Sequence, residues 1–555
     1  MNTNFDRDNA LQQTYDIIII GGGSHGAALA WEASKMGYSS ILLEKNDFAS
    51  GTSANSLKII HGGIRYLQKL SFKRLFYSTK ERAFLLQNFP HLVEPLQCFL
   101  PTEPKLTKRK FIVGTAFKFY DLLTYNKNFG IEAARKINNT HTVSKQQFIK
   151  LFPNIKNQSY TGGASWFDAR ANNSERLVFS YAMSAKQLGA QILNYCNVDK
   201  LITTNHTVTG VQTTDLISSK KYNIHAKFVI DTSGPWAFFK NQKTELKKTF
   251  EDSYAKAVNV VLDRKIVDHA IGLTIPANNH KKSRLLFYTP WRDKTVVGTW
   301  YFNHLSNSKD LETINKSELT EILNDINAQF ETENISEKNI TLIHKGLLPS
   351  QHSNPAKLEP ELISESYILQ EPELGLKNFF AIQGTKLTTA RVSALNCLKL
   401  CYQITKSSIP QPSSVQNTNK YPVANYGKNF DNYHEFLSQS VIKYANIWSK
   451  DVIIRLANNF GSNIQLINHL AIKHPQLAQM VPGTNNVTRA EIKYILDAEM
   501  VYTLADVLFR RCDIGSANIP SKECIDYCVA ELTNKFQWSD EQKENNIKEF
   551  LELYP

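Results

Sequence analysis

Glycines near the amino terminus have the spacing of a turn that binds the phosphates of a dinucleotide. The turn is Gly21-x-Gly23-x-x-Gly26, and it follows the apolar run Asp16–Ile20, which suits a strand buried on both faces. The first glycine makes the bend, the second lets backbone approach a pyrophosphate, and the third lets a helix pack on the strand. Glu44, about twenty residues further on, can accept hydrogen bonds from ribose hydroxyls. Strand, helix and acid together favour a nucleotide site over an ordinary turn between strand and helix.

A second loop carries side chains that can move protons and hold anions. It spans residues 46–67 and places Lys58, His61 and Arg65 among small polar residues and glycines. Such glycines let backbone approach a flat ring closely. Histidine side chains change charge near neutral pH, so His61 is a candidate base or proton relay. A lone histidine is more often structural, and the residues alone leave both interpretations open.

Later strand and turn patterns predict that the chain returns to the nucleotide and then adds further regions. Phe228–Asp231 leads into a turn at Gly234, and Phe379–Gln383 leads into a turn at Gly384. Alternating apolar and polar residues over 254–346 predict an antiparallel sheet, which is a candidate substrate domain. A Ser-, Pro-, Gln- and Asn-rich segment then predicts a linker, and the pattern over 433–554 is helical.

The composition is that of a soluble globular protein with an anionic partner. Of the 555 residues, 42% are hydrophobic and 21% are charged. No apolar run is long enough to cross a bilayer, and residues 1–15 lack the apolar core of a secretory signal, so we expect a cytoplasmic protein. The net charge of +13 suits a phosphate substrate, a nucleic acid or an acidic lipid surface. Because no nucleic-acid recognition motif accompanies the basic residues, we expect no nucleic-acid partner.

Residues 101–129 interleave basic with aromatic side chains, a composition typical of segments that bind membrane surfaces. The alternative is an amphipathic helix whose apolar side lies in the core and whose lysines face water. The residues alone leave both open.

The seven cysteines indicate neither a disulfide framework nor a metal site. Cys397 and Cys401 are four residues apart, as are Cys524 and Cys528, which places each pair on one face of a helix. We therefore expect reduced core cysteines and no metal centre.

These segments together resemble the FAD-dependent, aerobic and quinone-linked glycerol-3-phosphate dehydrogenase family over nearly the full length of the chain. The resemblance implies an α/β fold in which an FAD-binding Rossmann-like domain carries an inserted antiparallel-sheet substrate domain and is followed by an all-α C-terminal domain. The segments that carry it are 16–28, 52–67, 232–236, 289–291, 384–389 and 494–515.

On this resemblance the chain divides into three parts. An FAD-dependent oxidoreductase region occupies 1–410, a linker 411–430 and a helical C-terminal domain 431–555. Within the first part, the FAD-binding segments are about 15–100, 160–240 and 355–405, and the substrate-domain segments are about 101–159 and 245–350.

The resemblance also implies a reaction and its residues. The C2 hydroxyl of sn-glycerol 3-phosphate is oxidised to the ketone of dihydroxyacetone phosphate, a hydride passes to flavin N5, and the electrons continue to quinone, with oxygen as the alternative acceptor. Peripheral contact with an anionic membrane face is a further expectation. The implied catalytic residues are His61, Arg65 and Lys386, and the implied substrate-binding residues are Arg65, Tyr66 and Lys386. The predicted FAD-binding residues are Gly21, Gly23, Ser24, His25, Gly26, Glu44, Lys45, Thr52, Ser53, Ser56, Lys58, His61, Gly62, Gly63, Val198, Ser233, Gly234, Gly384, Lys386, Leu387 and Thr388.

Three departures from the family pattern fall in the substrate half. Leu348 stands where the family has an arginine expected to hold the substrate phosphate, Glu365 replaces another arginine, and Trp300-Tyr301 replaces Thr-Asp. Loss of a bidentate arginine from a dianion site costs about a hundredfold in affinity unless another residue replaces it. The alternatives are therefore a less phosphorylated alcohol or hydroxy acid as substrate, or a flavoprotein that binds without turning over. His344, Lys345 and Arg284 are the candidates to compensate.

Overall fold

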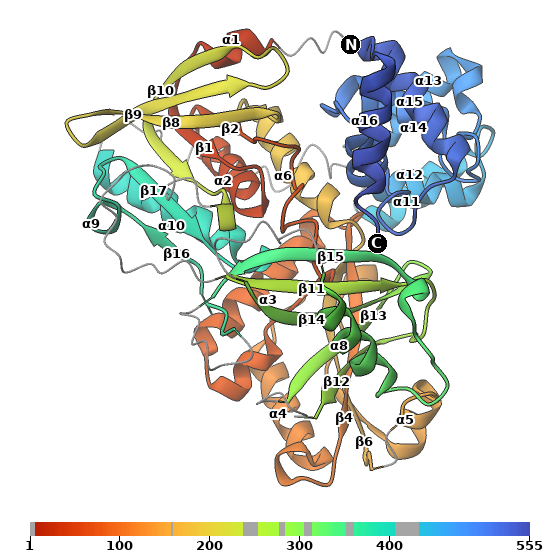
Figure 1. Ribbon diagram of the computed structural model, residues 1–555. Coiled ribbons are helices and arrows are strands. Elements are labelled where there is room, and N and C mark those ends of the chain that lie inside the picture. The colour runs from red at the N-terminus through yellow and green to blue at the C-terminus, as the bar shows by residue number, and fades with distance from the viewer. Residues whose placement is uncertain are drawn as a thin grey trace. The chain divides into compact units, whose positions relative to one another are not determined.

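The computed structural model describes residues 6–156, 159–236, 254–276, 283–304, 314–350, 360–363, 365–405 and 432–555 (Figure 1). The chain packs into two compact units. Unit 1 comprises residues 1–54, 173–252 and 363–552, and unit 2 comprises residues 55–172, 253–362 and 553–555. Each unit therefore draws on segments that are distant along the chain.

A mostly parallel sheet forms the centre of unit 1. Its strands follow the order β16-β17-β10-β1-β2-β7, and the β8–β9 hairpin extends from β10. The apolar run predicted as the first strand is β1 (Thr14–Ile20), which pairs in parallel with β2 (Ser40–Leu43) and with β10 (Lys221–Asp231). The remaining strands are β7 (Gln191–Leu193), β8 (Cys196–Thr204), β9 (Thr207–Asp215), β16 (Tyr367–Leu369) and β17 (Phe379–Gln383).

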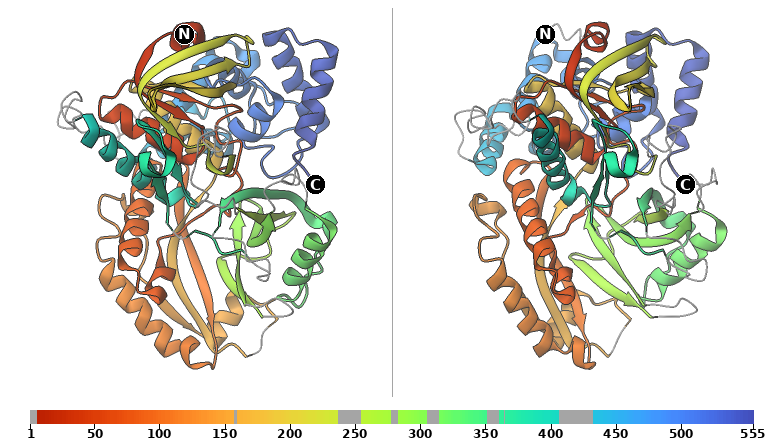
Figure 2. Two further views of the ribbon diagram at one scale, coloured as in Figure 1. Left: turned by 60° about the vertical axis from the view of Figure 1, so that its left-hand side comes forward. Right: turned by 90° about the vertical axis from the view of Figure 1, so that its left-hand side faces the viewer.

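Three helices pack together beside this sheet. Helix α2 (Ser24–Lys35) follows the glycine turn and lies against α6 (Ser174–Gln187) and α10 (Leu387–Thr405) (Figure 2). The α2 residues from Gly26 to Ser34 are buried. The short helices α1 (Arg7–Leu11) and α9 (Glu371–Leu374) complete the α/β part, so the predicted Rossmann-like domain is confirmed.

Every described element from residue 432 to the end of the chain is helical, and the predicted all-α region is confirmed. A π-helical turn at Asp506–Arg511 lies within it. The predicted linker at 411–430 lies outside the described residues. The helices are α11 (Tyr433–Tyr444), α12 (Lys450–Phe460), α13 (Ile464–Lys473), α14 (Arg489–Ala498), α15 (Lys522–Phe536) and α16 (Asp540–Leu551).

Unit 2 is built on a nine-stranded sheet that is antiparallel except where β12 meets β4. Helix α8 (Lys316–Asn327) covers one face, because Ile322 and Ile326 join a core with Val258 and Trp300. The other helices are α3 (Phe72–Asn88), α4 (Lys110–Leu123) and α5 (Lys145–Leu151). The strands are β3 (Ile59–Ile60), β4 (Val93–Thr102), β5 (His141–Ser144), β6 (Gly162–Ala171), β11 (Tyr254–Leu262), β12 (Ala270–Ile275), β13 (Arg284–Trp291), β14 (Lys294–His304) and β15 (Ile340–Pro349).

Strands β3, β4 and β6 belong to this second sheet. The sequence prediction grouped residues 55–100 and 160–172 with the FAD-binding segments, whereas their packing places them in unit 2. The loop with His61 is thus attached to the antiparallel sheet through the pairing of Ile60 with Ala169. All seven cysteines are buried and free, as predicted.

Candidate active site

The glycine turn of unit 1 leaves no room for side chains. Gly21 has φ +101°, and a Cβ on it would lie 2.8 Å from the Cα of Ser233. A Cβ on Gly26 would lie 1.9 Å from the carbonyl oxygen of Gly21 and 2.6 Å from Oγ1 of Thr232. The backbone of α2 therefore starts directly at the carboxyl end of β1, where the helix dipole favours phosphate. This cradle fits the pyrophosphate of FAD.

Glu44 lies at the end of β2, where the acid of a dinucleotide site is expected. Its carboxylate accepts hydrogen bonds from the backbone amides of Gly22 (2.5 Å) and Asn46 (2.7 Å). Burial raises the pKa of Glu44. Each carboxylate oxygen has a second lone pair, so Glu44 can still accept a ribose hydroxyl.

Two further glycine turns, which sequence analysis singled out, reach the same region of unit 1. Ser233 and Gly234 follow β10, and Thr232 donates its hydroxyl to the carbonyl oxygens of Ile20 and Gly21. Gly384 follows β17, and a Cβ there would lie 2.6 Å from Nε2 of His25. That Nε2 is buried and has no hydrogen-bond partner among the described residues. The three turns thus converge at the carboxyl ends of β1, β10 and β17, which is where ligands bind in parallel sheets.

The remaining predicted cofactor residues divide between the two units. Ser53 accepts a hydrogen bond from the backbone amide of Ser24 (3.0 Å), which places its hydroxyl at the start of α2. Lys45, Thr52, Val198, Leu387 and Thr388 also lie in unit 1, with Val198 buried in β8 and Leu387 at the start of α10. Ser56, Lys58, Gly62 and Gly63 lie in unit 2, where Lys58 is buried with its Nζ 5.4 Å from the ring centre of Trp291.

His61 of unit 2 is held by a buried carboxylate. Its Nδ1 lies 3.1 Å from Oδ2 of Asp168, and the His61 side chain is 48% exposed whereas that of Asp168 is 1% exposed. Burial alone would raise the pKa of Asp168, but its hydrogen bond with His61 and the charges of His61 and Arg82 lower that pKa to about 2. An ionised carboxylate only accepts hydrogen bonds, so Nδ1 carries the proton, and Nε2 of the neutral ring is an acceptor.

Further donors fix the Asp168 carboxylate in place. Its Oδ1 accepts hydrogen bonds from the backbone amide of Gly62 (2.7 Å) and from the guanidinium of Arg82 (2.9 Å). The indole of Trp166 donates to Oδ2 (3.2 Å). Gly62 must lack a side chain, because a Cβ would lie 1.9 Å from NH1 of Arg82.

Sequence analysis missed Asp168 and Arg82 as members of this cluster. Asp168 lies 107 residues from His61, on β6, and Arg82 lies within α3. An acid and an arginine without neighbouring glycines carry no local signal of a site. The pairing of β3 with β6, which brings them to His61, is a long-range contact that a single sequence does not reveal.

The other predicted catalytic residues lie on different elements. Arg65 is exposed in the 3₁₀ turn Ile64–Lys69. Burial raises the pKa of Tyr301, and the positive charge of Arg65 opposes that rise. Tyr66 follows it in the same turn, with its amide bonded to the carbonyl oxygen of Gly63 (2.8 Å). Lys386 belongs to unit 1, where its carbonyl oxygen accepts hydrogen bonds from Thr389 at the start of α10.

The departures from the family pattern are divided between the two units: Leu348 and Trp300-Tyr301 lie on strands β15 and β14 of unit 2, and Glu365 lies in unit 1. Leu348 pairs with Ala255 across β15 and β11, and Glu365 is exposed in unit 1. Arg284, a candidate to replace the lost arginine, is instead paired with Glu321 (2.7 Å) and Asp325 (3.4 Å). This arginine is therefore already neutralised by acids on α8.

His344 is no better placed to hold a phosphate. It is buried, its Nδ1 lies 3.2 Å from the carbonyl oxygen of Ser56, and burial holds its pKa well below the ordinary value. A neutral histidine supplies no charge to a dianion. Lys345, the third candidate, is the next residue of β15, so its side chain points to the opposite face from those of His344 and Leu348.

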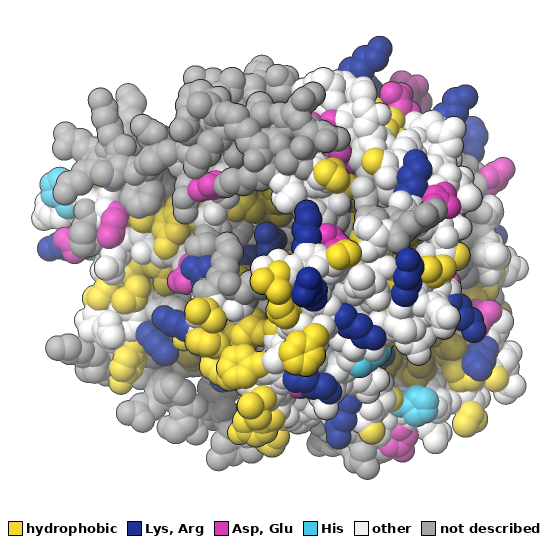
Figure 3. All heavy atoms as spheres, turned by 90° about the horizontal axis from the view of Figure 1, so that it is seen from below, with side chains coloured by type: hydrophobic (Ala, Val, Ile, Leu, Met, Phe, Trp, Pro, Cys, Tyr) yellow, Lys and Arg dark blue, Asp and Glu magenta, His cyan; other side chains and the backbone are white. Residues whose placement is uncertain are grey.

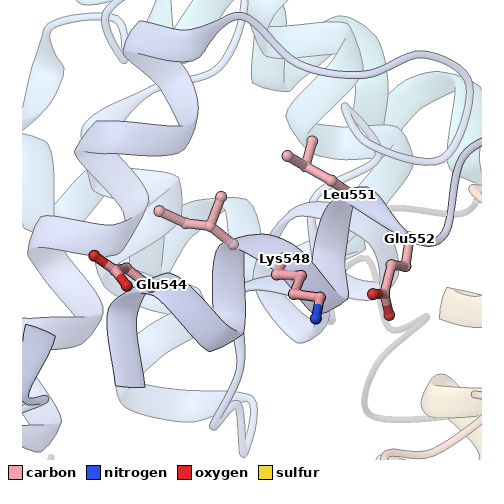
Figure 4. Close-up of a pocket in the computed structure, with 5 residues that line it drawn as sticks. Glu544, Lys548, Leu551 and Glu552 are labelled. Carbon is pink, nitrogen blue, oxygen red and sulfur yellow. The ribbon is translucent and has the colours of Figure 1, made fainter. Parts of the chain in front are cut away.

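A hollow of about 510 Å³ lies on the last helix (Figure 4). It is lined by Glu544, Ile547, Lys548, Leu551 and Glu552, which come from α16 and the residue after it. None of these is a predicted site residue, and the hollow is not assigned to the active site.

The parallel sheet, with its glycine turn and terminal acid, defines unit 1 as a dinucleotide-binding fold. The family model described as FAD dependent oxidoreductase matches residues 16–394. The chain belongs to this family, and FAD is its cofactor. A second model, described as the C-terminal domain of alpha-glycerophosphate oxidase, matches residues 418–543.

Relatives named glycerol-3-phosphate dehydrogenase match along nearly the whole chain. The aerobic glycerol-3-phosphate dehydrogenase of Staphylococcus epidermidis is 29% identical, over 98% of this chain and 95% of the relative. The glycerol-3-phosphate dehydrogenase of Synechocystis is 27% identical, over 97% of this chain and 96% of the relative.

A solved structure shares the fold. The glycerol-3-phosphate dehydrogenase from Bacillus halodurans, complexed with FAD, has a TM-score of 0.75 and 22% identity, with 99% of this chain and 97% of that chain covered.

Proposed function

We propose that this oxidoreductase oxidises the C2 hydroxyl of sn-glycerol 3-phosphate to the ketone of dihydroxyacetone phosphate and passes the electrons to quinone. Relatives named glycerol-3-phosphate dehydrogenase span nearly its whole length, and the C-terminal model carries the name of alpha-glycerophosphate oxidase. Both names refer to the same substrate. The net charge of +13 suits an anionic one.

The observation that carries this proposal is the His61–Asp168 pair. Oxidation of a secondary alcohol requires removal of the hydroxyl proton as the C2 hydride leaves. His61 has an acceptor at Nε2, and Asp168, 3.1 Å from Nδ1, stabilises the positive ring that forms after proton transfer. FAD, when bound, supplies the hydride acceptor at flavin N5. The exposed half of the His61 side chain leaves it open to a substrate.

Arg65 and Lys386 extend the proposal to the charge of the substrate. Both supply N–H donors to a phosphate or a developing alkoxide, and the exposed Arg65 lies in the turn that directly follows His61. Tyr66 is assigned to the same substrate-binding turn.

Anaerobic titration of the purified yellow protein with sn-glycerol 3-phosphate tests the proposal. We expect bleaching of the flavin absorbance, and a His61→Gln variant that keeps FAD but bleaches about 10³-fold more slowly. His225→Gln, which changes an exposed histidine on β10, is the matched control and should bleach at the normal rate. An FAD-loaded protein that is not bleached by this substrate would refute the proposal.

A second candidate substrate is an alcohol or hydroxy acid without a phosphate. Two specific observations favour it. Leu348 on β15 stands where the family has an arginine, and Arg284 is paired with two acids, so neither position offers a cation for phosphate binding. If this candidate is right, a panel of hydroxy acids bleaches the flavin faster than glycerol 3-phosphate does. Leu348→Arg should then shift preference toward the phosphate by about tenfold, whereas an unchanged preference argues for the first candidate.

We also propose that unit 2 contacts an anionic membrane, where quinone is found. Phe111, Leu122 and Phe129 in and after α4 are 83%, 69% and 87% exposed. The basic residues Lys110 and Lys118 lie on the same helix. Figure 3 shows hydrophobic and basic side chains intermixed on the face seen from below. Phe117 and Tyr120 of α4 are buried and Val113 packs against the same core, so the membrane proposal rests on the exposed apolar side chains of this segment named above.

Co-sedimentation with vesicles that contain anionic lipid tests the membrane proposal. We expect binding that weakens with salt and is lost in Phe111→Ser/Leu122→Ser. The matched control is Ile442→Ser/Ile472→Ser, two isoleucines of the helical region that are 71% and 62% exposed. Equal loss in both variants would refute specific contact through α4. No helix among the described residues is both long and apolar enough to cross a membrane.

A quinone analogue and oxygen can be compared directly as acceptors. Reduced protein mixed with a water-soluble quinone should reoxidise faster than in air-saturated buffer and without stoichiometric peroxide. Peroxide formation at the rate of substrate oxidation would instead assign oxygen as the acceptor.

A further inference from the structure

The loop after β2 is bound by two consecutive arginines of the helical region. Asp47 in that loop accepts a hydrogen bond from Nε of Arg510 (2.7 Å) and two from the guanidinium of Arg511 (2.7 and 2.8 Å). Asn194 donates to the same carboxylate (2.8 Å). All four residues belong to unit 1, although Asp47 and Arg510 are 463 positions apart along the chain.

These ionic contacts are buried and geometrically fixed. The side chains of Asp47 and Arg511 are 0% and 1% exposed. Arg511 also donates to the carbonyl oxygen of Glu499 (3.1 Å), and its guanidinium lies 3.9 Å from the ring centre of Phe179. Arg510 pairs in addition with Asp506 in the π-helical turn. Breaking a buried ion pair of this kind leaves an uncompensated charge, so the groups it joins keep one arrangement while the pair is intact.

The conformation that is specified includes Glu44. The loop 44–49 folds back on the glycine turn, because the Gly22 amide donates to Glu44 (2.5 Å) and the Ala49 amide donates to the Gly22 carbonyl oxygen (3.1 Å). Phe48 packs so close that a Cβ on Gly22 would lie 2.6 Å from it. Asp47 is therefore the anchor of a short loop that carries the ribose acceptor at one end and contacts the phosphate turn at the other.

We propose that Arg510 and Arg511 of the C-terminal helical region hold the loop 44–49 in the conformation that binds the adenosine half of FAD. Asp47, Arg510 and Arg511 are positioning residues in this role, because they act through Glu44 and Gly22. The inference rests on FAD as the cofactor and is independent of the proposed substrate.

The physical reason is the cost of a buried unpaired charge. When the guanidinium groups are removed, Asp47 must reach water or take up a proton, and the loop of six residues from Glu44 to Ala49 rearranges with it. Glu44 then leaves the position in which it accepts ribose hydroxyls. Glu44 is assigned to the adenosine half of the cofactor and not to the flavin half. Binding of the flavin half should therefore be affected least.

Binding measurements on the full-length protein stripped of flavin test the proposal. FAD, ADP and riboflavin are titrated separately into the wild type and into Arg511→Gln, Arg510→Gln and Asp47→Asn, with protein fluorescence as the readout. We expect the Kd for FAD and for ADP to rise about tenfold or more in Arg511→Gln, while the Kd for riboflavin changes less than twofold. Arg511→Lys should restore part of the loss.

The matched control is Arg455→Gln. Arg455 is a second buried arginine of the helical region, and it pairs with Glu491 (2.7 Å) and Asp513 (2.6 Å) without contacting the loop. Its replacement should lower the thermal midpoint as much as Arg511→Gln does and leave the Kd for ADP unchanged. Equal weakening of ADP in the Arg455 and Arg511 variants would overturn the proposal, as would unchanged ADP binding in Arg511→Gln.

A double-mutant cycle keeps the test decisive if Arg511→Gln does not fold. In Asp47→Asn, Arg510→Gln and the double variant, the changes in FAD binding should be less than additive, because both act through one contact. Strict additivity would mean that Arg510 acts on FAD by another route and would overturn the assignment.

Discussion

Two histidines lie beside glycine turns in this protein, His25 in unit 1 and His61 in unit 2, and their surroundings are opposite. The Nε2 of His25 is buried and unpartnered within the described part of the chain, and burial lowers the pKa of His25 to about 4. His61 is half-exposed and bonded to the carboxylate of Asp168. The first histidine is held neutral by its environment, whereas the second has a counter-charge ready for its protonated form.

Under the proposed function, this difference assigns a shape role to His25 and a proton-transfer role to His61. His25 packs where a Cβ on Gly384 would touch it, so it fills space beside the cofactor turn. His61 has a fixed tautomer and an anionic partner, which orient the ring and stabilise its protonated form. The residue type is the same in both loops, and the neighbouring carboxylate decides the chemistry.

The largest effect is expected when His61 loses its carboxylate. Asp168→Asn replaces an acceptor charge by a neutral amide and removes the stabilisation of the protonated ring, so kcat should fall about 10³-fold while bound FAD is unchanged. Buried Arg82 also loses its partner, which should destabilise the protein by about 3 kcal/mol. Steady-state kinetics and flavin absorbance measure both.

Trp166→Phe is the control for that variant, because it removes one hydrogen bond to the same carboxylate and leaves its charge. A decrease in kcat of about tenfold or less is expected. If Asp168→Asn keeps more than a tenth of the wild-type kcat, the contrast between the two histidines does not explain catalysis.

A smaller effect, on protein stability, is expected when low pH protonates His25. The pKa of His25 is about 4 in the folded protein and 6.5 ordinarily, so the unfolded chain binds more protons between these values. The contribution of neutral His25 to stability is present above pH 6.5 and is lost as the pH falls toward 4, by up to about 3 kcal/mol. His25→Asn should therefore reduce the loss of thermal midpoint between pH 7 and pH 5 in the flavin-free protein. An equal loss in wild type and variant would contradict this.

The smallest effect is expected when His25 is crowded. Gly384→Ala places a Cβ 2.5 Å from Oγ of Ser366 and 2.6 Å from Nε2 of His25, so these side chains must move. Overpacking of this kind costs about 1 kcal/mol, and the Kd for FAD should rise several-fold. Gly114→Ala, whose new Cβ would lie 3.2 Å from a methyl group of Thr142, is the control and should leave FAD binding unchanged. FAD binding at wild-type affinity in Gly384→Ala would show that His25 can move freely.

The glycine turn, its place between β1 and α2, and the cofactor class were predictable because their signals are local. Gly21, Gly23, Gly26 and Glu44 lie within one β-α-β unit, where backbone geometry favours the glycines and the ribose hydroxyls favour the acid. The fold class follows from the same kind of signal, since hydrophobic periodicity and glycine positions can be read within short segments of the sequence.

The chemical half was predictable only in part. His61 and Arg65 stand out beside glycines, but Asp168 and Arg82 become neighbours only through the pairing of β3, β4 and β6. The anchoring of Asp47 by Arg510 and Arg511 is a contact of the same type, between regions at opposite ends of the chain. Residues whose role depends on a partner far along the chain carry no pattern of their own.

The strand pairings also set an order of assembly on the ribosome. The central sheet of unit 1 pairs Ile17 with Phe228 and Val229 with Phe379, so it stays incomplete until β17 has been synthesised. The last strand of the sheet in unit 2 ends at Pro349, before β17 begins. Since pairing must wait for both partners, the antiparallel sheet with the His61–Asp168 pair can form while the nascent chain still lacks part of its cofactor domain. We therefore expect the emerging polypeptide to acquire protease resistance in unit 2 before it can retain flavin.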